Sequence, residues 1–511
     1  MWLALCAVIL GTFVTVLNNS LINVAIPEMT NVFGSTTDTM QWVLTGYSLA
    51  AAIVIPLSGF LGDRFGTKKL FIISLAGFTI TSVLCGLAWS DISLIAFRVL
   101  QGISGGVLSP LSMTIIYGIV PKNKIGTALG IWGIAAMAAP AVGPTISGYL
   151  IDFFSWRWLF FISVPFGIFA VTAGIFLLKE SPLKQASFDL GGAVLSVIFF
   201  STLLLALGQG NKEGWTSLYI VGLLFVSFFS LLLLIWVEAG AEDPLLDLQL
   251  FKNPIFTLSV ICGGLVMAGL MGGSFLVPLY LQNVQGLTPI DTGIIMIPQG
   301  VLMALMMPLS GRLFDKLGVV PVAIAGLLLM STTTYELQHL AINTPIPWLT
   351  VILALRGMGI GLCMMPITTA GMNSIPKELI GRGSSLSNVL RQVAGTMSIA
   401  IFTTLMTNRQ IFHVRNIADG IPSDSYLATQ ALSQISSALA QMGTDAATAT
   451  GGASAVLVGI MQKEALNSAI ADTFLISAIP LFVCIPCVFL FIKRRTVKTK
   501  EKMVPAKEAA L

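Results

Sequence analysis

Fourteen apolar stretches of roughly membrane-spanning length run through the sequence, most of them separated by short polar loops. A helix needs about 20 apolar residues to cross a bilayer, and lipid offers no partner to an unpaired backbone group, so each stretch is expected to form a helix. The predicted spans are 2–26, 41–62, 70–90, 93–119, 126–151, 157–178, 189–208, 217–237, 255–281, 290–314, 318–337, 347–372, 384–407 and 470–492. The sequence therefore predicts an all-α integral membrane protein with fourteen transmembrane helices.

Composition excludes several classes of protein. Hydrophobic residues make up 55% and charged residues 10% of the 511 residues, whereas an ordinary soluble protein carries about a quarter charged residues. The net charge of +4 is too small to indicate a nucleic-acid partner. All six cysteines fall in apolar stretches, and the two histidines, His339 and His413, fall in outer regions. We therefore expect no disulfide framework, metal, cofactor or enzymatic activity.

Basic residues predict the orientation of the spans. With the amino terminus inside, inner loops, the inner parts of spans and the tail hold 20 of the 27 Lys and Arg residues, outer loops and outer span ends hold five, and two lie deeper within spans. Basic residues are retained on the cytoplasmic side of a membrane, so both termini of this multi-pass protein are expected on the cytoplasmic side of the cell membrane. The segment 408–469 is then extracellular, and it is predicted to contain an amphipathic helix at 426–441.

One short phrase occurs twice: residues 56–66 are PLSGFLGDRFG and residues 308–318 are PLSGRLFDKLG, with seven of eleven residues identical. A second pair, PKNKIG at 121–126 and PKELIG at 376–381, has nearly the same offset. The first pair ends spans 2 and 10, and the second follows spans 4 and 12. Two six-span halves in the same orientation are therefore predicted, which is the plan of many secondary transporters with a central site between the halves.

The repeats also predict the domain boundaries. We expect an N-terminal six-helix bundle over 1–180, two inserted helices over 181–240, a C-terminal six-helix bundle over 241–492 that includes the extracellular segment, and a basic cytoplasmic tail over 493–511. An inserted pair of spans keeps the second half in the orientation of the first, whereas a single inserted span would invert it. The two bundles are thus expected to be pseudo-symmetric.

The repeated loop is predicted to be a conformational latch on the cytoplasmic side. Its glycines allow close approach between helices, and its acidic residue can cap or pair with a neighbouring helix. The residues concerned are Gly59, Asp63, Arg64 and Gly66 in the first half and Gly311, Asp315 and Gly318 in the second. For the adjacent Lys68 and Lys69, anchoring at the anionic inner leaflet is the preferred interpretation.

Two arginines are predicted to lie at membrane depth. Arg98 falls about six residues below the outer end of span 4, and Arg356 lies deeper in span 12. An arginine at such a depth costs on the order of 3 kcal/mol on insertion scales. Each is therefore expected to face a partner or a water-filled cavity, with outward snorkelling as the alternative for Arg98.

Span 5 combines Pro140 and Pro144 with Gly133, Gly143 and Gly148. The prolines remove two backbone hydrogen bonds on one face, and the glycines leave that face without bulk. We expect a bent helix that packs and slides against the opposite half, with a plain packing kink as the alternative.

Several of these segments resemble motifs of the major facilitator superfamily. GFLGDRFGTKK (59–69) is similar to its loop signature after span 2, FRVLQGISGG (97–106) to its span 4 signature, and GPTISG (143–148) to its span 5 antiporter motif. LNNSLINVAIP (17–27) and PLLDLQLF (244–251) resemble the fourteen-span drug:proton antiporter branch, the EmrB/QacA type. The resemblance covers nearly the whole chain outside the extracellular segment.

The resemblance implies proton-coupled exchange in which Arg98 takes part. Where the span 1 pattern of the family usually carries an aspartate, this chain has Asn18, which cannot carry a proton. Since no other carboxylate is predicted near the midplane, Asp291 at the outer start of span 10 is the second candidate for proton coupling. A helix-capping role for Asp291 is the alternative.

Amide, aromatic and methionine side chains are suited to a cavity for amphipathic molecules. The candidate substrate-binding residues are Asn18, Asn19, Asn23, Trp42, Tyr47, Trp132, Tyr280, Gln299, Arg356 and Met364. For the three asparagines interhelical hydrogen bonding is the alternative, and the aromatic, glutamine and methionine residues fit a packed core or an interfacial belt equally well.

We expect a monomeric transporter that exports small amphipathic molecules or drugs, and so confers multidrug or antibiotic resistance, by alternating access driven by protons. An importer, or a lipid or solute flippase on the same fold, is the alternative. Because Arg98 and Arg356 lie within spans and no buried carboxylate is predicted, neutral, zwitterionic or weakly basic substrates are expected rather than permanent dications.

Overall fold

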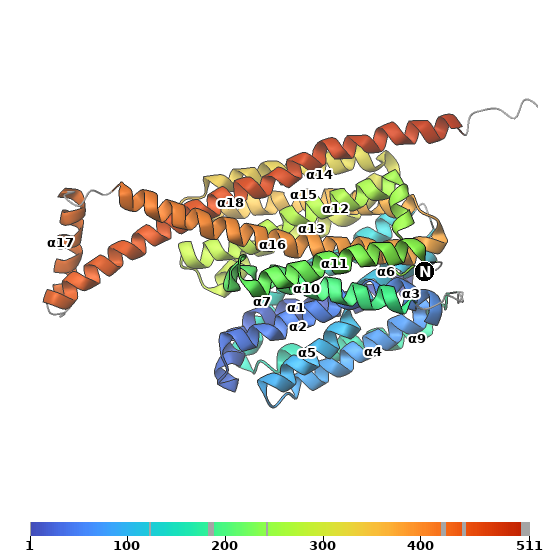
Figure 1. The fold of residues 1–511 in the computed structure, drawn as a ribbon, viewed down its shortest axis with the longest axis horizontal. Coiled ribbons are helices and arrows are strands. Elements are labelled where there is room, and N and C mark those ends of the chain that lie inside the picture. Colours follow the sequence, from blue (N-terminus) through green and yellow to red (C-terminus); the bar gives the residue numbers. More distant parts are fainter. Residues whose placement is uncertain are drawn as a thin grey trace, which may run out of the picture.

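The computed structural model describes residues 2–121, 124–181, 189–241, 244–420, 426–441 and 446–501. Over these residues the chain folds into helices joined by short connections, with no strand, and most of the helices run side by side (Figure 1). The elements are α1 (Trp2–Phe33), α2 (Thr37–Val54), α3 (Leu57–Phe65), α4 (Thr67–Gly86), α5 (Asp91–Gly106), α6 (Leu108–Ile119), α7 (Ile125–Phe153), α8 (Trp158–Phe161), α9 (Ser163–Leu177), α10 (Leu190–Glu213), α11 (Leu218–Gly240), η2 (Leu248–Lys252), α12 (Pro254–Leu279), η3 (Tyr280–Val284), α13 (Pro289–Leu317), α14 (Val319–Glu336), η4 (Leu337–His339), α15 (Ile346–Asn373), η5 (Lys377–Leu379), α16 (Ile380–Asp419), α17 (Tyr426–Gln441) and α18 (Ala446–Glu501).

The helices correspond to the predicted spans. Within the described residues, twelve helical segments are long and apolar enough to cross a membrane, and the pair α2–α3, bent by 57°, makes a thirteenth. The remaining predicted span is α7, whose described apolar part is Ile125–Ala135. The prediction of an all-α integral membrane protein is confirmed, and its count of fourteen spans agrees with the order of the helices.

Polar residues at the loop ends begin many of the spans. A side-chain oxygen that accepts a backbone N–H of the first turn satisfies a donor that the helix itself leaves unpaired. Such N-caps are Thr36 for α2, Ser90 for α5, Asp189 for α10, Ser217 for α11, Asn253 for α12 and Thr288 for α13. Short polar loops therefore separate the apolar helices.

The main helix contacts within the first half have counterparts eight spans later. Span 1 (α1) packs on spans 5 and 6 (α7, α9), span 2 (α2) on span 4 (α5), and span 3 (α4) on spans 4 and 6. In the second half, α12 packs on α16 and α18, α13 on α15, and α14 on α15 and α18. The two sets of contacts are the same once the first half is shifted onto the second, as expected for pseudo-symmetric bundles. The exact domain boundaries stay a prediction.

The inserted helices α10 and α11 connect the two halves. They pack on each other, and α10 also contacts α2 of the first half and α16 of the second. At the outer end, Trp215 Nε1 donates to Thr404 Oγ1 at 2.9 Å, and Thr404 Oγ1 donates to Asn211 Oδ1 at 2.7 Å. The insertion is therefore bonded to α16 rather than held by lipid contacts alone.

Two helices extend beyond the bundle on the side predicted to be extracellular (Figure 1). The sequence predicts spans 384–407 and 470–492 at these places, but α16 continues to Asp419 and α18 begins at Ala446. Helix α17 covers Tyr426–Gln441 and packs on α18, so the helix predicted at 426–441 is confirmed. The segment is longer and more regular than a loop because its polar Ala-, Ser- and Thr-rich sequence is compatible with helix. From here on, the side predicted to be cytoplasmic is called the inner side and the opposite side the outer side.

Candidate functional site

The two halves meet along a surface that we call the seam. It consists of α7 against α13, and of α16 against α3 and α6, the inner segments of spans 2 and 4. At its inner end the backbones of Gly126 and Gly311 touch: a Cβ atom on Gly311 would overlap the carbonyl oxygen of Gly126, and one on Gly130 would overlap that of Met307. Only glycine permits such close approach of two helices.

Asp315 of the second repeated phrase lies at the start of α7. Its carboxylate accepts the hydroxyl of Thr127 at 3.4 Å and packs so closely on Gly126 that a Cβ atom there would overlap Asp315 Oδ1. A helix begins with unpaired N–H groups and a partial positive charge, which a carboxylate stabilises. Asp315 therefore fastens the second half to the first half of the chain.

Asp63 of the first repeated phrase makes the matching contact on the other side of the seam. Its Oδ2 lies 3.7 Å from Nε of Arg382, in the first turn of α16, and both side chains are mostly buried. Gly59, one turn earlier, packs against the backbone of residues 381–382. Asp63 thus fastens the first half to the second.

Two serines of α16 complete this inner contact. The break between α2 and α3 at Pro56 interrupts the regular hydrogen bonding of the helical backbone. Ser385 Oγ donates to the carbonyls of Ile55 and Pro56 at 2.6 and 3.1 Å, and Ser384 Oγ donates to that of Pro110 at 3.1 Å. Bonds from the second half therefore satisfy the bent segment of the first.

The four repeated phrases thus contact one another crosswise. Asp63 and Asp315 are equivalent positions of one phrase, and Arg382 and Thr127 each follow directly after the phrases PKELIG and PKNKIG. Both aspartates are predicted from the sequence, but their partners are not. The second pair of phrases, PKNKIG and PKELIG, marks the positions of these partners in the sequence. Which phrase contacts which follows only from the twofold arrangement of the halves.

The remaining latch residues have local roles in the geometry. Gly66 has φ +88° and Gly318 has φ +84°, which non-glycine residues rarely adopt. Against Gly66, the Glu180 carboxylate accepts the backbone N–H groups of Lys68 and Lys69 at 3.1 and 3.2 Å, at the start of α4. The Arg64 guanidinium is exposed and lies near the Phe60 ring, with 6.0 Å between its Cζ and the ring centroid.

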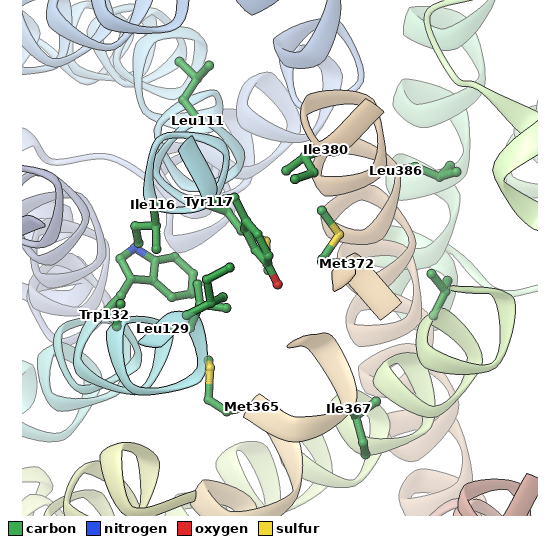
Figure 2. Packing of buried hydrophobic residues seen from close by; sticks show 14 of the residues in the cluster. Leu111, Ile116, Tyr117, Leu129, Trp132, Met365, Ile367, Met372, Ile380 and Leu386 are labelled. Atoms are coloured by element: carbon green, nitrogen blue, oxygen red, sulfur yellow. The ribbon is translucent and has the colours of Figure 1, made fainter. Parts of the chain in front are cut away.

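An apolar layer lies beside these polar contacts. Figure 2 shows Tyr117 and Leu129 of the first half facing Met365, Met372 and Ile380 of the second, and all five belong to one buried cluster. Trp132, a predicted substrate-binding residue, is in the same layer, where its Nε1 donates to Thr12 Oγ1 at 3.0 Å. The seam is therefore closed on its inner side by packed side chains as well as by hydrogen bonds.

Arg98 is fully buried inside the first half. Its Nε donates to the carbonyl of Val43 at 2.9 Å, and one terminal nitrogen donates to Asn18 Oδ1 at 3.2 Å and Gln101 Oε1 at 2.6 Å. The other terminal nitrogen donates to Asn19 Oδ1 at 3.3 Å, and the guanidinium lies over the Tyr47 ring at 4.2 Å. The expectation that Arg98 faces a partner is confirmed, and outward snorkelling is excluded.

The network around Arg98 consists of neutral groups. Asn18 Nδ2 donates onward to Ser163 Oγ at 2.9 Å, and Gln101 Nε2 donates to Ser82 Oγ at 2.7 Å, so five spans share the network. Among the described residues no carboxylate pairs with Arg98. Asn18 occupies the place at which an acid would neutralise the guanidinium, and this buried charge is held by dipoles alone.

Two further arginines lie within the helices of the second half. Arg356 is fully buried; its Nε donates to Thr334 Oγ1 at 3.0 Å and a terminal nitrogen donates to the carbonyl of Gly269 at 2.5 Å. Arg391 lies eleven residues into α16, where it donates to Asn388 Oδ1 at 3.1 Å. It falls within the predicted span 384–407, so it is a span arginine, although the count of basic residues places it on the inner side.

The span 5 glycines do not share one face, contrary to the prediction. Gly133 packs on the Met307 side chain and Gly148 on Ile290, both of α13, whereas Gly143 packs on Ser20 of α1 within its own half. Gly126 and Gly130, which the sequence analysis does not single out, make closer contacts with α13 than Gly148 does. Their spacing of four residues, which places both on one face of the helix, is the sequence signal for this contact. The side chains of Pro140 and Pro144 lie outside the described part of the structure, so the predicted bend is not tested.

The other predicted site residues lie apart from the seam network. Asp291 is exposed and forms a capping pair with Thr288, whose hydroxyl donates to Asp291 Oδ2 at 2.7 Å, as in the alternative interpretation. Trp42 lines an outer pocket between α2 and α10. Tyr280 is fully buried and donates to the carbonyl of Ala341 at 2.7 Å, a packing role.

Gln299 and Met364 remain candidates of the second half. Gln299 is 7% exposed, its backbone packs against Gly357, and its Oε1 has no hydrogen-bond partner among the described residues. Met364 is half-buried on α15. The side chain of Asn23 lies outside the described residues.

The chain matches known transporters along most of its length. Residues 8–399 match the family model of the Major Facilitator Superfamily. The chain is 39% identical over 410 residues to YhcA of Bacillus subtilis, named an uncharacterized MFS-type transporter, covering 80% of this chain and 77% of that protein. It is 32% identical over 422 residues to the lincomycin resistance protein LmrB of Listeria monocytogenes, with 82% and 89% covered. It is 33% identical over 422 residues to the multidrug export protein EmrB of Escherichia coli, with 81% and 82% covered.

Solved structures share the fold at low sequence identity. The human organic anion transporter MFSD10 superposes with a TM-score of 0.59 at 14% identity, covering 94% of this chain and 99% of that one. The proton:xylose symporter XylE superposes with a TM-score of 0.58 at 14% identity, with 95% and 96% covered. The paired halves, the crosswise contacts of their repeated phrases and these matches together establish that the chain belongs to the major facilitator superfamily of multi-pass membrane transporters.

Proposed function

We propose that this transporter exports small amphipathic organic molecules across the cytoplasmic membrane in exchange for protons. The observation that carries the proposal is the crosswise closure of the seam, in which Asp63 contacts Arg382 and Asp315 contacts the start of α7. These contacts use a few small and charged groups on one side of the membrane, so they can break and re-form while each half stays folded. Alternating access requires this behaviour.

The proposed direction of transport is inferred from the names of similar proteins. Proteins named for multidrug export and lincomycin resistance are about one third identical to this chain over four fifths of its length. In the proposed cycle the present conformation is the one closed to the cytoplasm. Both termini then lie in the cytoplasm, α17 lies outside the cell, and the chain works as a monomer.

The buried charge narrows the proposed substrates. Arg98 and Arg356 are surrounded by neutral donors and acceptors, and Asn18 supplies an amide where an acid could bind a cationic drug. A permanent dication would meet like charge without a compensating carboxylate. Neutral, zwitterionic or weakly basic compounds are the proposed cargo, with Arg98 taking part in proton coupling.

The test uses purified protein in liposomes. A pH step is imposed, and proton flux is followed together with the movement of a neutral antibiotic, a weak base and a permanent dication, with Arg98→Ala as the comparison. Substrate movement with coupled proton flux, lost in Arg98→Ala, is the expected result. Substrate movement without proton flux would refute exchange, and transport of the dication alone would refute the charge argument.

A further inference from the structure

Two carboxylates meet at the inner ends of the inserted helices. Asp189 directly precedes α10, and Glu238 lies in the last turn of α11 with 3% of its surface exposed. A Cβ atom on Gly192 would overlap both Asp189 Oδ2 and Glu238 Oε1. The two oxygens therefore converge on the same glycine, and each carboxylate faces the other.

Among the residues that the structure describes, no donor reaches these two facing oxygens. Asp189 Oδ1 accepts the N–H of Gly192 at 2.8 Å, and Glu238 Oε2 accepts the N–H of Leu246 at 3.2 Å. Asp189 Oδ2 and Glu238 Oε1 are buried and have no hydrogen-bond partner within the described part of the chain. Two ionised carboxylates in this position would repel each other, whereas one proton held between them supplies the missing donor.

The surroundings connect this pair to the seam. Phe60 of α3 packs with Ala193 of α10 and Leu245, so the latch segment touches the inserted helices directly. Among the described residues, the charged groups close enough to act on Glu238 are Asp189 and Arg382, and Arg382 also pairs with Asp63. The nearby Asp247 of the same connection caps η2 through the N–H of Gln249.

We propose that Asp189 and Glu238 together bind one exchangeable proton from the inner side, and that this proton controls how firmly Arg382 holds Asp63. With the proton bound as an O–H on one facing oxygen, the pair carries a single negative charge and Arg382 remains with Asp63. When the proton leaves to water at the inner surface, the second negative charge attracts Arg382 away from Asp63. A more alkaline inner side therefore loosens the seam. The proposal rests on the proposed function only in treating the seam as the moving part.

The bound proton is tested directly by infrared spectroscopy on the full chain in lipid nanodiscs. A protonated buried carboxyl gives a carbonyl band that shifts on hydrogen–deuterium exchange, and this band should titrate with pH. Asp189→Asn and Glu238→Gln, which are close in shape to the native residues, should each abolish it. Glu213→Gln, at the exposed outer end of the same α10, is the matched control and should retain it. A spectrum without the band, or a band that survives both substitutions, overturns the proposal.

The effect on the seam is measured with spin labels at the exposed positions Lys69→Cys and Lys316→Cys, one in each half. Cys6 and Cys487, which are not buried, are first replaced. The distance between the labels should increase with pH in the parent and in Glu213→Gln, and this pH response should be lost in Glu238→Gln and Asp189→Asn. Exchange of sodium for choline should change nothing; a sodium-dependent shift would contradict proton binding.

Liposome transport separates this inference from the proposed function. If the distance between the spin labels depends on pH, and this dependence requires Asp189 and Glu238, but no compound is exported, the proposed function is refuted and the proton site is supported. If export is observed while both substituted proteins keep the parental pH response, the proton site fails alone.

Discussion

The substitution Gly311→Ala should open the inner side of the seam. Its new Cβ would overlap the carbonyl oxygen and carbon of Gly126 and approach the backbone nitrogen of Thr127. These are backbone atoms of a helix, so no change of rotamer can relieve the overlap. In the closed conformation α7 and α13 must therefore move apart. An open conformation lacks this contact, so the substitution destabilises only the closed one.

The size of the effect follows from the cost of overpacking. Inserting a methyl group into a well-packed contact costs about 1–3 kcal/mol, which corresponds to an increase of about 5- to 150-fold in the ratio of open to closed molecules. Alanine also favours helix over glycine by about 1 kcal/mol. That gain is the same in both conformations because α13 is helical in both, so it cancels from the ratio.

The assay is the distance between spin labels at Lys69→Cys and Lys316→Cys. Gly311→Ala should give a longer population that the parent lacks, together with reduced export. Gly118→Ala is the matched control, since it lies at the inner end of α6 and its Cβ would meet nothing within 4 Å. Equal distance distributions for the two variants would refute the steric account of the seam.

Three further predictions concern other contacts. Arg98→Lys keeps the charge but loses the planar fork, which leaves oxygens of Asn18, Asn19 and Gln101 without donors at a cost of about 1–3 kcal/mol each. Thermal scans should show a lower melting temperature, and liposome assays at least a tenfold loss of export. Wild-type behaviour would show that the charge alone suffices. Asn18→Asp places a carboxylate beside Arg98, with an attraction on the order of 4 kcal/mol at 4 Å. The variant should transport a permanent dication, measured as uptake into everted vesicles. Unchanged selectivity would show that Asn18 does not determine the choice of substrate. Thr404→Val removes the hydroxyl that joins Trp215 and Asn211 to α16 and leaves the bond from Asn211 Nδ2 to the carbonyl of Ala400. Hydrogen exchange over 211–215 should accelerate by several-fold for about 1 kcal/mol lost per bond, and equal rates would mean that the Thr404 hydroxyl does not hold the insertion.

The bundle could be predicted from the sequence because membrane helices are specified locally. Apolar length identifies each span, and the two repeated phrases identify the halves and their common orientation. Helix ends were harder to predict. Span 13 is predicted to begin at residue 384, whereas α16 begins at Ile380, because hydropathy cannot show that the polar residues just before a span already belong to its helix.

The partners across the seam could not be predicted in the same way. Asp63 and Arg382 are 319 positions apart, and their contact depends on how one half docks on the other. Gly143 shows the same limitation, since it packs on Ser20 of its own half although its neighbours in the motif pack on α13. Spacing along a helix indicates a face, but only the docked bundle indicates which neighbour that face meets.

Helix α16 runs without interruption from Ile380, beside the latch, to Asp419 outside the bundle. Its 40 residues form a rod about 60 Å long at a rise of about 1.5 Å per residue. If its base pivots by about 10°, the far tip swings by about 10 Å over that length. A dye attached to this tip, on the side predicted to be extracellular, would therefore report whether the inner side of the seam is closed.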